Sequence, residues 1–263
     1  MVKKLRVILD GPRGGAENMA IDEALLRSGN GEPTLRLYRW DEPTLSLGYF
    51  QSTTEIARAG PQAASLPLIR RPTGGGAIVH ADELTYCLIV PTPEHTDAGQ
   101  LYAWMHGVIA GAASSLDGPS ERASLTMRDG GEPETNGEFF CFRRRGRYDL
   151  LVASTTAEPL VASTSAEPMA GEAKVAGSAQ RRTRAAILQH GSVILQCWPA
   201  QGGASLSDVL GRRVGFDELA AAVVEAIRGR NIRAESGALT AAERRLAGEL
   251  RNKHESPQWL RRR

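Results

Sequence analysis

The sequence predicts an α+β fold in which mixed or antiparallel β-sheets are flanked by helices. Three observations support this prediction. Short runs of alternating polarity occur in clusters, whereas an α/β fold would alternate strands and helices one by one. Stretches with helical periodicity precede, separate and follow these clusters. The 263 residues are 41% hydrophobic, which suffices for a sizeable core in one large domain or two small ones.

The first half of the chain supplies the first cluster of strands. Residues 1–11 read as a strand, because their apolar run is too short for a signal peptide. Residues 16–26 place apolar side chains between acids at helical spacing and predict an amphipathic helix. Thr34–Trp40 and residues 44–50 alternate on either side of an Asp-Glu-Pro turn and predict a hairpin. Further short strands are expected at residues 68–71, 77–80 and 84–90.

The second half predicts helices around a second strand cluster. Residues 100–116, rich in alanine, and Phe216–Arg228 have helical patterns, as do residues 240–253, where Thr240 and Glu243 fit a capping box. Residues 118–137 are rich in Gly, Glu, Pro and Asn and are expected to be partly loop. Strands are expected at residues 148–153, 173–177 and 187–196.

A tandem repeat interrupts the second cluster. Residues 152–159 read VASTTAEP and residues 161–168 read VASTSAEP, a tandem repeat with a nine-residue period. Two copies are too few for a solenoid. The predicted strands on either side favour a duplicated insertion, at about residues 152–170, in the tip of a hairpin. A passive loop is one interpretation, because such positions tolerate added residues. A lid or a docking arm is the other.

Composition excludes several classes of function. The formal net charge is +2, too small for a nucleic-acid-binding protein. No apolar run is long enough to span a bilayer, so we expect no membrane insertion. The three cysteines lack C-x-x-C spacing, which predicts a reducing cytoplasm without disulfides or a metal site. Basic residues cluster in three places, and each cluster is either a solvated face or a dock for an acidic partner: residues 143–147, 181–184 and 261–263.

Residues 70–80, RRPTGGGAIVH, form the most informative segment. Gly74, Gly75 and Gly76 let the backbone approach a ligand closely and expose its N–H groups. Arg70 and Arg71 bring planar, permanently charged donors to the same loop. Such a loop suits a carboxylate, a phosphate or the carbonyl of an activated acyl group. The two arginines could instead position the loop itself.

Three motifs together resemble the biotin/lipoate cofactor-transferase family. The first is the Arg-Arg-Pro-Thr-Gly-Gly loop; the second is the run KVAGSAQ at residues 174–180, followed by His-Gly-Ser at residues 190–192. The third is Cys141-Phe142 with Tyr-Asp-Leu-Leu-Val at residues 148–152, which is similar to the Cys-dependent octanoyltransferases of lipoate synthesis. The resemblance spans residues 16–259 and implies a single domain, residues 1–263, of the class II biotin–lipoate transferase-like fold.

The resemblance implies that Cys141 is a nucleophile and Lys174 its activator. A thiol can take an acyl group from another thioester, and a nearby cation increases its thiolate fraction. Cys141 could also be a core cysteine, but it follows a Gly-containing segment and precedes a basic run. Cys87 and Cys197 lie in apolar surroundings and are expected to pack.

Other residues are expected to bind the acyl substrate. Gly177, Ser178 and Ala179 would form a pocket wall whose backbone N–H groups face the acyl carbonyl. By resemblance, His80 and His190 would position the substrate rather than act as bases, although each could be a core histidine with one hydrogen bond. The remaining predicted contacts are Gly191, Arg71 and the tunnel entrance at Gly74, Gly75 and Gly76.

The resemblance implies an octanoyltransferase that needs no cofactor. It would move an octanoyl group from acyl carrier protein through Cys141 to a lysine of a lipoyl domain, either the glycine cleavage H protein or a 2-oxoacid dehydrogenase E2. The alternatives are an ATP-dependent lipoate–protein ligase and an inactive binding homologue. Cys141 and the run Glu83-Leu-Thr-Tyr favour the transferase, and too few residues follow His190 for a ligase accessory domain. Gly76 favours the ligase, since many of the transferases carry arginine there.

Overall fold

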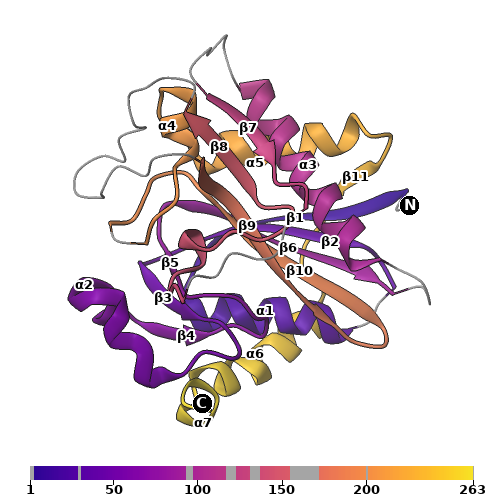
Figure 1. Ribbon diagram of the computed structural model, residues 1–263. Helices are drawn as coiled ribbons and strands as arrows, with labels where there is room; N and C mark the ends of the chain where they lie inside the picture. The colour runs from indigo at the N-terminus through magenta and orange to yellow at the C-terminus, as the bar shows by residue number, and fades with distance from the viewer. Residues whose placement is uncertain are drawn as a thin grey trace.

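The structure is a computed structural model that describes residues 3–28, 31–92, 97–116, 123–130, 137–154, 172–199 and 201–262. Its centre is an eight-stranded sheet with the order β11-β1-β2-β6-β10-β9-β8-β7 (Figure 1). β1 runs parallel to β11 and β2, and the other neighbours are antiparallel. The strands are β1 (Lys4–Arg13), β2 (Thr34–Trp40), β6 (Glu83–Pro91), β7 (Ala123–Met127), β8 (Leu150–Ser154), β9 (Glu172–Arg182), β10 (Ala186–Ile194) and β11 (Arg233–Ser236).

A second sheet of three strands has the order β4-β3-β5. Its strands are β3 (Thr44–Leu47), β4 (Leu68–Arg70) and β5 (Ile78–His80). The predicted hairpin between Thr34–Trp40 and residues 44–50 is therefore wrong. Both edges of β2 are already paired, with β1 and with β6, so the chain turns after Trp40 and starts the second sheet. β3 ends at Leu47, earlier than predicted.

Helices cover both faces of the large sheet. α3 (Ala98–Leu116) and α5 (Phe216–Arg228) pack on one face, around a core that includes Leu35, Leu37 and Tyr86. α1 (Gly15–Ser28) and α6 (Ala241–Glu255) pack on the other, around a core that includes Tyr38 and Cys87. Alternate residues of β2 thus face opposite layers, as a pleated strand requires. Figure 1 shows α1 and α6 on the same side as the small sheet.

Several short elements lie outside the sequence predictions. They are η1 (Thr53–Ala59), α2 (Gly60–Ala64), η2 (Cys141–Arg143), α4 (Leu206–Leu210), α7 (Pro257–Leu260) and the strands β7 and β11. β7 falls in the segment that the sequence assigns partly to loop; it pairs with β8 at the edge of the sheet. The capping box at Thr240 and Glu243 is present at the start of α6, as predicted.

The strands that flank the tandem repeat are paired. Leu151 lies opposite Lys174, and Val152 lies opposite Ala173, in the antiparallel β8–β9 ladder. The predicted pairing of the flanks is therefore confirmed. The repeat itself, apart from its first residues in β8, lies outside the described residues.

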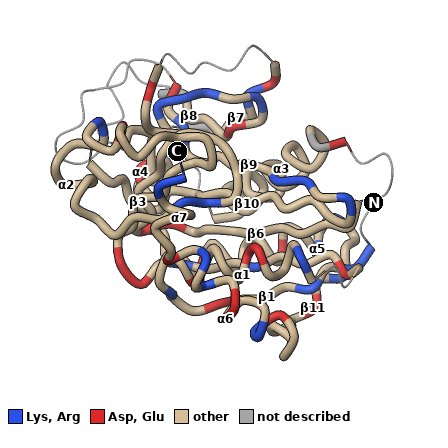
Figure 2. Tube along the Cα trace, turned by 90° about the horizontal axis from the view of Figure 1, so that it is seen from below, with Lys and Arg blue, Asp and Glu red and all other residues tan. Residues whose placement is uncertain are grey.

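Charged residues are mixed over much of the molecule. Figure 2 shows acidic and basic positions interspersed along α1 and α6, whereas basic segments gather beside β7 and β8. In that basic run, Arg144 and Arg145 donate to the carbonyls of Glu138 and Glu172. Part of this cluster therefore braces the backbone. Within the part of the chain that the structure describes, no helix is long and apolar enough to cross a bilayer.

Candidate active site

The Gly-rich loop between β4 and β5 is held by its own arginines. Arg71 is buried, and its guanidinium donates to the carbonyls of Gly74 (2.9 Å) and Gly76 (2.5 Å) and to Ser46. Arg70 donates to the carbonyls of Gly48 (2.9 Å) and Leu260 (2.7 Å). These bonds use the arginine donors to position the loop. Burial lowers the pKa of Arg71 to about 10, so it stays a cation at neutral pH.

The same loop packs against the segment that carries Cys141. The amide of Ala77 donates to Phe139 O (2.9 Å), and the amide of Cys141 donates to Ala77 O (2.8 Å). A β-carbon on Gly76 would lie 2.8 Å from Cys141 N and equally close to Phe139 O. Gly75 has φ +96°, and a β-carbon there would lie 2.9 Å from the Arg71 guanidinium and 3.9 Å from the Cys141 sulfur. Only glycines allow these two segments to approach so closely.

Cys141 lies beside Lys174, which is paired with Asp149. The distance from Lys174 Nζ to Cys141 Sγ is 3.7 Å, and from Nζ to Asp149 Oδ2 it is 2.8 Å. Lys174 and Asp149 are only 4% and 6% exposed, whereas Cys141 is half-buried. Burial disfavours the ammonium, but the negative charges of Cys141 and Asp149 outweigh it and raise the pKa of Lys174. The structure therefore places a buried cation against the sulfur.

Sequence reasoning missed the role of Asp149. Its Oδ2 also accepts a hydrogen bond from Gly146 N (2.6 Å), which fixes the carboxylate beside Lys174. Tyr148, just before it, has φ +73°, a conformation that is uncommon outside glycine. The carbonyl of Tyr148 accepts a hydrogen bond from Nδ1 of the buried His106. The sequence did contain a signal for this role. Asp149 directly precedes the apolar run of β8, and an acidic residue is rarely buried without a partner.

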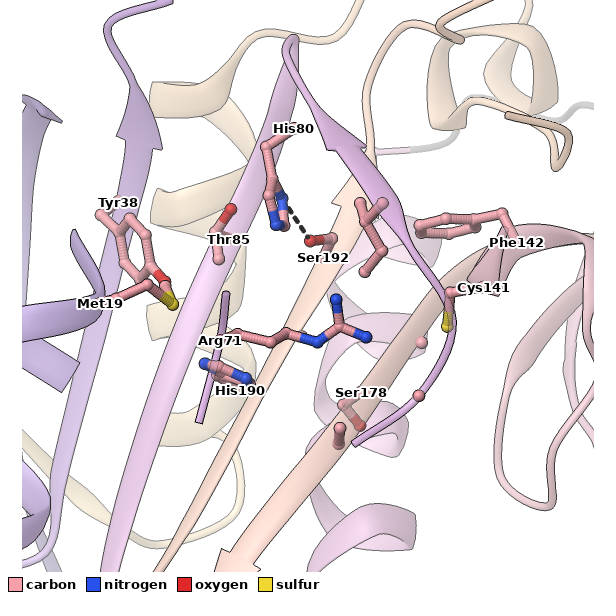
Figure 3. A pocket seen from close by; sticks show the side chains of 15 residues that line it. Met19, Tyr38, Arg71, His80, Thr85, Cys141, Phe142, Ser178, His190 and Ser192 are labelled. Carbon is pink, nitrogen blue, oxygen red and sulfur yellow. Dashed lines mark hydrogen bonds between the residues drawn. The ribbon is translucent and has the colours of Figure 1, made fainter. Parts of the chain in front are cut away.

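A cavity extends from Cys141 over one face of the large sheet, across its neighbouring strands (Figure 3). It lies over one cross-strand row, in which Tyr38 pairs with Thr85, Thr85 with Ser192, and Ser192 with Gly177. The other lining residues are Met19, Arg71, Gly75, Ile78, His80, Cys141, Phe142, Ser178, Ala179, His190 and Gly191. The cavity surface is mainly apolar. Gly74 and Gly76 support the loop but are absent from this lining.

The two predicted histidines line the cavity and are also anchored beneath it. In the neutral form of His190, Nδ1 donates to Asp22 Oδ2 at 3.2 Å and Nε2 accepts from Thr73 Oγ1 at 2.6 Å. Burial outweighs Asp22 and lowers the pKa of His190, which favours this neutral form. His190 thereby ties β10 to the Gly-rich loop through Thr73.

His80 is held in a separate network. Its Nδ1 lies 2.7 Å from Glu83 Oε1, which also accepts from Ser192 Oγ at 2.8 Å. Its ring stacks on Trp40 with 4.0 Å between ring centroids. Both histidines therefore keep part of the character of core residues, as the second interpretation allowed. Figure 3 shows both rings bordering the cavity between Tyr38 and Cys141.

The wall glycines and small residues are placed where bulk would block the site. A β-carbon on Gly177 would lie 2.2 Å from Lys174 Cε, and one on Gly191 would lie 2.5 Å from Gly177 O. Ser178 Oγ donates to His106 Nε2 at 2.8 Å, so its hydroxyl is occupied. Gly177, Ser178 and Ala179 pair with β10 along one edge, while the β8 ladder ends at Ala176.

The other two cysteines lie away from this pairing. Cys87 is buried in β6, and burial raises its pKa well above the ordinary thiol value. Burial also raises the pKa of Cys197, to about 12. Both remain protonated at neutral pH, in agreement with their predicted packing role. Within the described ranges, no cluster of three or more His, Cys, Asp or Glu side chains is placed to hold a metal ion.

Residues 15–201 match the model of the lipoyl protein ligase A/B catalytic domain. The chain belongs to this family. The octanoyltransferase LipM of Moorella thermoacetica is 33% identical over 276 residues, which cover 94% of this chain and 93% of that protein. The family predicted from the sequence motifs is thereby confirmed.

Two solved structures show that the fold is that of lipoate–protein ligases. A putative lipoate protein ligase from T. acidophilum, Ta0514, superposes with a TM-score of 0.73 at 21% identity, covering 99% of this chain and 100% of that chain. A bipartite lipoate protein ligase from Thermoplasma acidophilum, studied with its E2 lipoyl domain, gives 0.70 at 20% identity, covering 98% and 96%. The predicted fold class is confirmed in this member of the lipoyl protein ligase A/B family.

Proposed function

We propose that this protein is an octanoyltransferase of protein lipoylation that works through a thioester on Cys141. The observation that carries the proposal is the meeting of Cys141 Sγ, the buried Lys174 ammonium and one end of an apolar cavity. A thiolate next to a cation is a competent nucleophile, and an apolar cavity beside it fits an alkyl chain. The similarity to octanoyltransferase LipM supports the same reaction.

The first step loads the enzyme. The Cys141 thiolate attacks the thioester carbonyl of octanoyl–acyl carrier protein, a carbon–sulfur bond forms to Cys141, and the carrier thiolate leaves. The departing thiolate takes a proton, which the Lys174 ammonium supplies at 3.7 Å from the reacting sulfur. Lys174 is then a neutral amine, held in place by Asp149.

The second step delivers the acyl group. The ε-amine of a lysine on a lipoyl domain attacks the Cys141 thioester, an amide bond forms, and the carbon–sulfur bond to Cys141 breaks. Neutral Lys174 takes the proton that the attacking amine loses, which restores the ammonium–thiolate pair. The backbone of Gly177, Ser178 and Ala179 and the charge of Arg71 border the carbonyl position in this scheme. The whole cycle needs no ATP, because the donor thioester is already activated.

An ATP-dependent lipoate–protein ligase was the alternative, and Gly76 was the residue in its favour. The close packing of Gly76 against Cys141 N and Phe139 O is a structural reason for glycine at this position. A β-carbon there would collide with both atoms, so the packing of this loop requires the glycine in this chain whichever of the two activities it has. Cys141 has no part in an adenylating mechanism, and its placement beside Lys174 supports the transferase.

Incubation with octanoyl–acyl carrier protein tests the proposal. Without an acceptor, the protein should gain the mass of one octanoyl group, and neutral hydroxylamine should remove it. Cys141→Ala should take up no octanoyl group, whereas Cys87→Ala and Cys197→Ala should acylate normally. With an apo lipoyl domain, transfer should proceed equally with and without ATP. Attachment of free octanoate that depends on ATP, or acylation of Cys141→Ala, would contradict the proposal.

A further inference from the structure

The cavity beside Cys141 has a definite length across the sheet. Its floor row runs from Gly177 on β9, over Ser192 and Thr85, to Tyr38 on β2. Three inter-strand spacings separate β2 from β9, or about 14 Å at roughly 4.8 Å each. An extended octanoyl chain has seven carbon–carbon bonds and spans about 9 Å. The row is therefore long enough for an extended octanoyl chain and leaves about 5 Å for the groups at its two ends.

Tyr38 is a rigid part of the distal end. It is fully buried, and its hydroxyl donates to Asp22 Oδ2 at 2.9 Å. The guanidinium of Arg36 lies 3.9 Å from the centre of its ring and is itself paired with Asp22 at 2.9 Å. Moving this ring would take one hydrogen bond from the buried Asp22 carboxylate and the ring contact from the buried Arg36, which is costly. The Tyr38 wall therefore cannot yield to a longer ligand.

Met19 is the deformable part of the same end. It extends from α1, is 2% exposed, and meets Tyr38 at the end of the cavity opposite Cys141 (Figure 3). A methionine has several rotatable bonds and a compact thioether, and it fills irregular gaps without imposing one shape. Unlike Tyr38, it is anchored mainly by packing, because its thioether is only a weak hydrogen-bond acceptor. The distal end of the cavity therefore combines a fixed ring with a deformable side chain.

We propose that Met19, backed by the fixed Tyr38, determines the acyl-chain length that the protein accepts. The inference rests on the proposed acyl transfer through Cys141 and deepens it. A chain of eight carbons whose thioester carbon is at Cys141 fills the cavity up to the Met19 thioether. A chain of ten or twelve carbons meets the side chain and must displace it or leave methylenes outside.

Shortening Met19 should lengthen the preferred chain. Met19→Ala removes the outer three heavy atoms of the side chain, room for about two methylenes. Each methylene buried in an apolar site is worth about fourfold in binding. The rate of decanoyl transfer relative to octanoyl transfer should therefore rise on the order of tenfold. Met19→Phe places a bulkier, stiffer group at the same end and should favour hexanoyl over octanoyl.

The experiment compares acyl donors in competition. Hexanoyl-, octanoyl-, decanoyl- and dodecanoyl-carrier protein are mixed in equal amounts with each variant, and mass spectrometry reads the acyl group on Cys141. Ile21→Ala is the matched control, because Ile21 is also on α1, is 2% exposed and belongs to the same core, yet does not line the cavity. It should lose stability like Met19→Ala and keep the octanoyl preference.

The outcomes separate this inference from the proposed function. Octanoyl selectivity in the wild type that shifts in Met19→Ala and stays in Ile21→Ala supports it. Equal acceptance of octanoyl and dodecanoyl by the wild type overturns it, as does an unchanged profile in Met19→Ala, and acyl transfer stands in both cases. If no donor acylates Cys141, the proposed function fails. In that case, thermal unfolding with octanoate or dodecanoate still tests the role of Met19. Dodecanoate should raise the melting temperature of Met19→Ala but not that of the wild type or of Ile21→Ala.

Discussion

Gly177→Ala adds one methyl group at the point where Lys174 reaches Cys141. The new β-carbon would lie 2.2 Å from Lys174 Cε and 2.5 Å from its Nζ, whereas ordinary van der Waals contact begins at 3.4 Å. The end of the lysine must therefore move by about 1 Å or more to reach a tolerable contact. That movement takes Nζ away from Asp149, now at 2.8 Å, and changes its approach to the Cys141 sulfur.

The expected cost falls on catalysis far more than on folding. A misplacement of about 1 Å at a reacting centre can cost about 10²-fold, and a positioned proton-transfer group contributes about 10²–10⁴-fold. We expect kcat/KM for acyl transfer to fall by on the order of 10²–10³, or about 3–4 kcal/mol of barrier. The displaced atoms are the flexible end of a long side chain, so the free energy of unfolding should fall by only about 1–3 kcal/mol.

The assay measures the rate at which octanoyl–acyl carrier protein acylates Cys141, together with thermal unfolding of the same sample. Gly11→Ala is the control, because Gly11 is also a strand glycine and a β-carbon there meets nothing within 4 Å. It should acylate at the wild-type rate. Gly177→Ala acylating as fast as the wild type, while folded, would refute the reasoning that the glycine exists to admit the lysine.

Three further predictions concern the Cys141 thiol, the buried Glu23 and the tandem repeat. Lys174→Ala and Asp149→Asn should each slow iodoacetamide labelling of Cys141 at neutral pH, because the first removes the cation and the second removes its buried partner. An unchanged labelling rate would show that the Lys174–Asp149 pair does not activate the thiol. Burial opposes the charged form of Glu23, yet hydrogen bonds from His254 and Lys253 outweigh it and lower its pKa to about 2, so its stabilising effect is complete above about pH 4.5 and fades towards pH 2. Glu23→Gln should accordingly flatten the loss of stability over that range in acid unfolding measured by circular dichroism. Deleting one nine-residue copy of the tandem repeat should leave stability and turnover nearly unchanged, since loop closure changes by only about 0.6 kcal/mol per doubling of length; a folded but inactive deletion variant would instead indicate a lid or docking arm.

Local sequence patterns predicted many of the helices and strands, but they did not predict which strands pair with one another. The periodicity of residues 100–116 and the capping box at Thr240 depend on neighbours within a few turns, and both helices form as expected. The alternation of β2 and β3 gave the right strands in the wrong arrangement, because a strand pattern does not name its neighbours. β7 was missed because Gly and Pro on either side of a short strand resemble a loop.

The sequence by itself determined the chemistry on offer: a thiol at Cys141, a lysine at Lys174 and a glycine-rich loop at residues 74–76, each within a short motif. Only the tertiary structure decided what surrounds them. Asp149 joins Lys174 across the β8–β9 edge, the loop arginines turn to backbone carbonyls, and Met19 closes a cavity that starts at Cys141. Motifs record side-chain types along the chain, whereas these contacts depend on strand order and register, which packing of the whole molecule fixes.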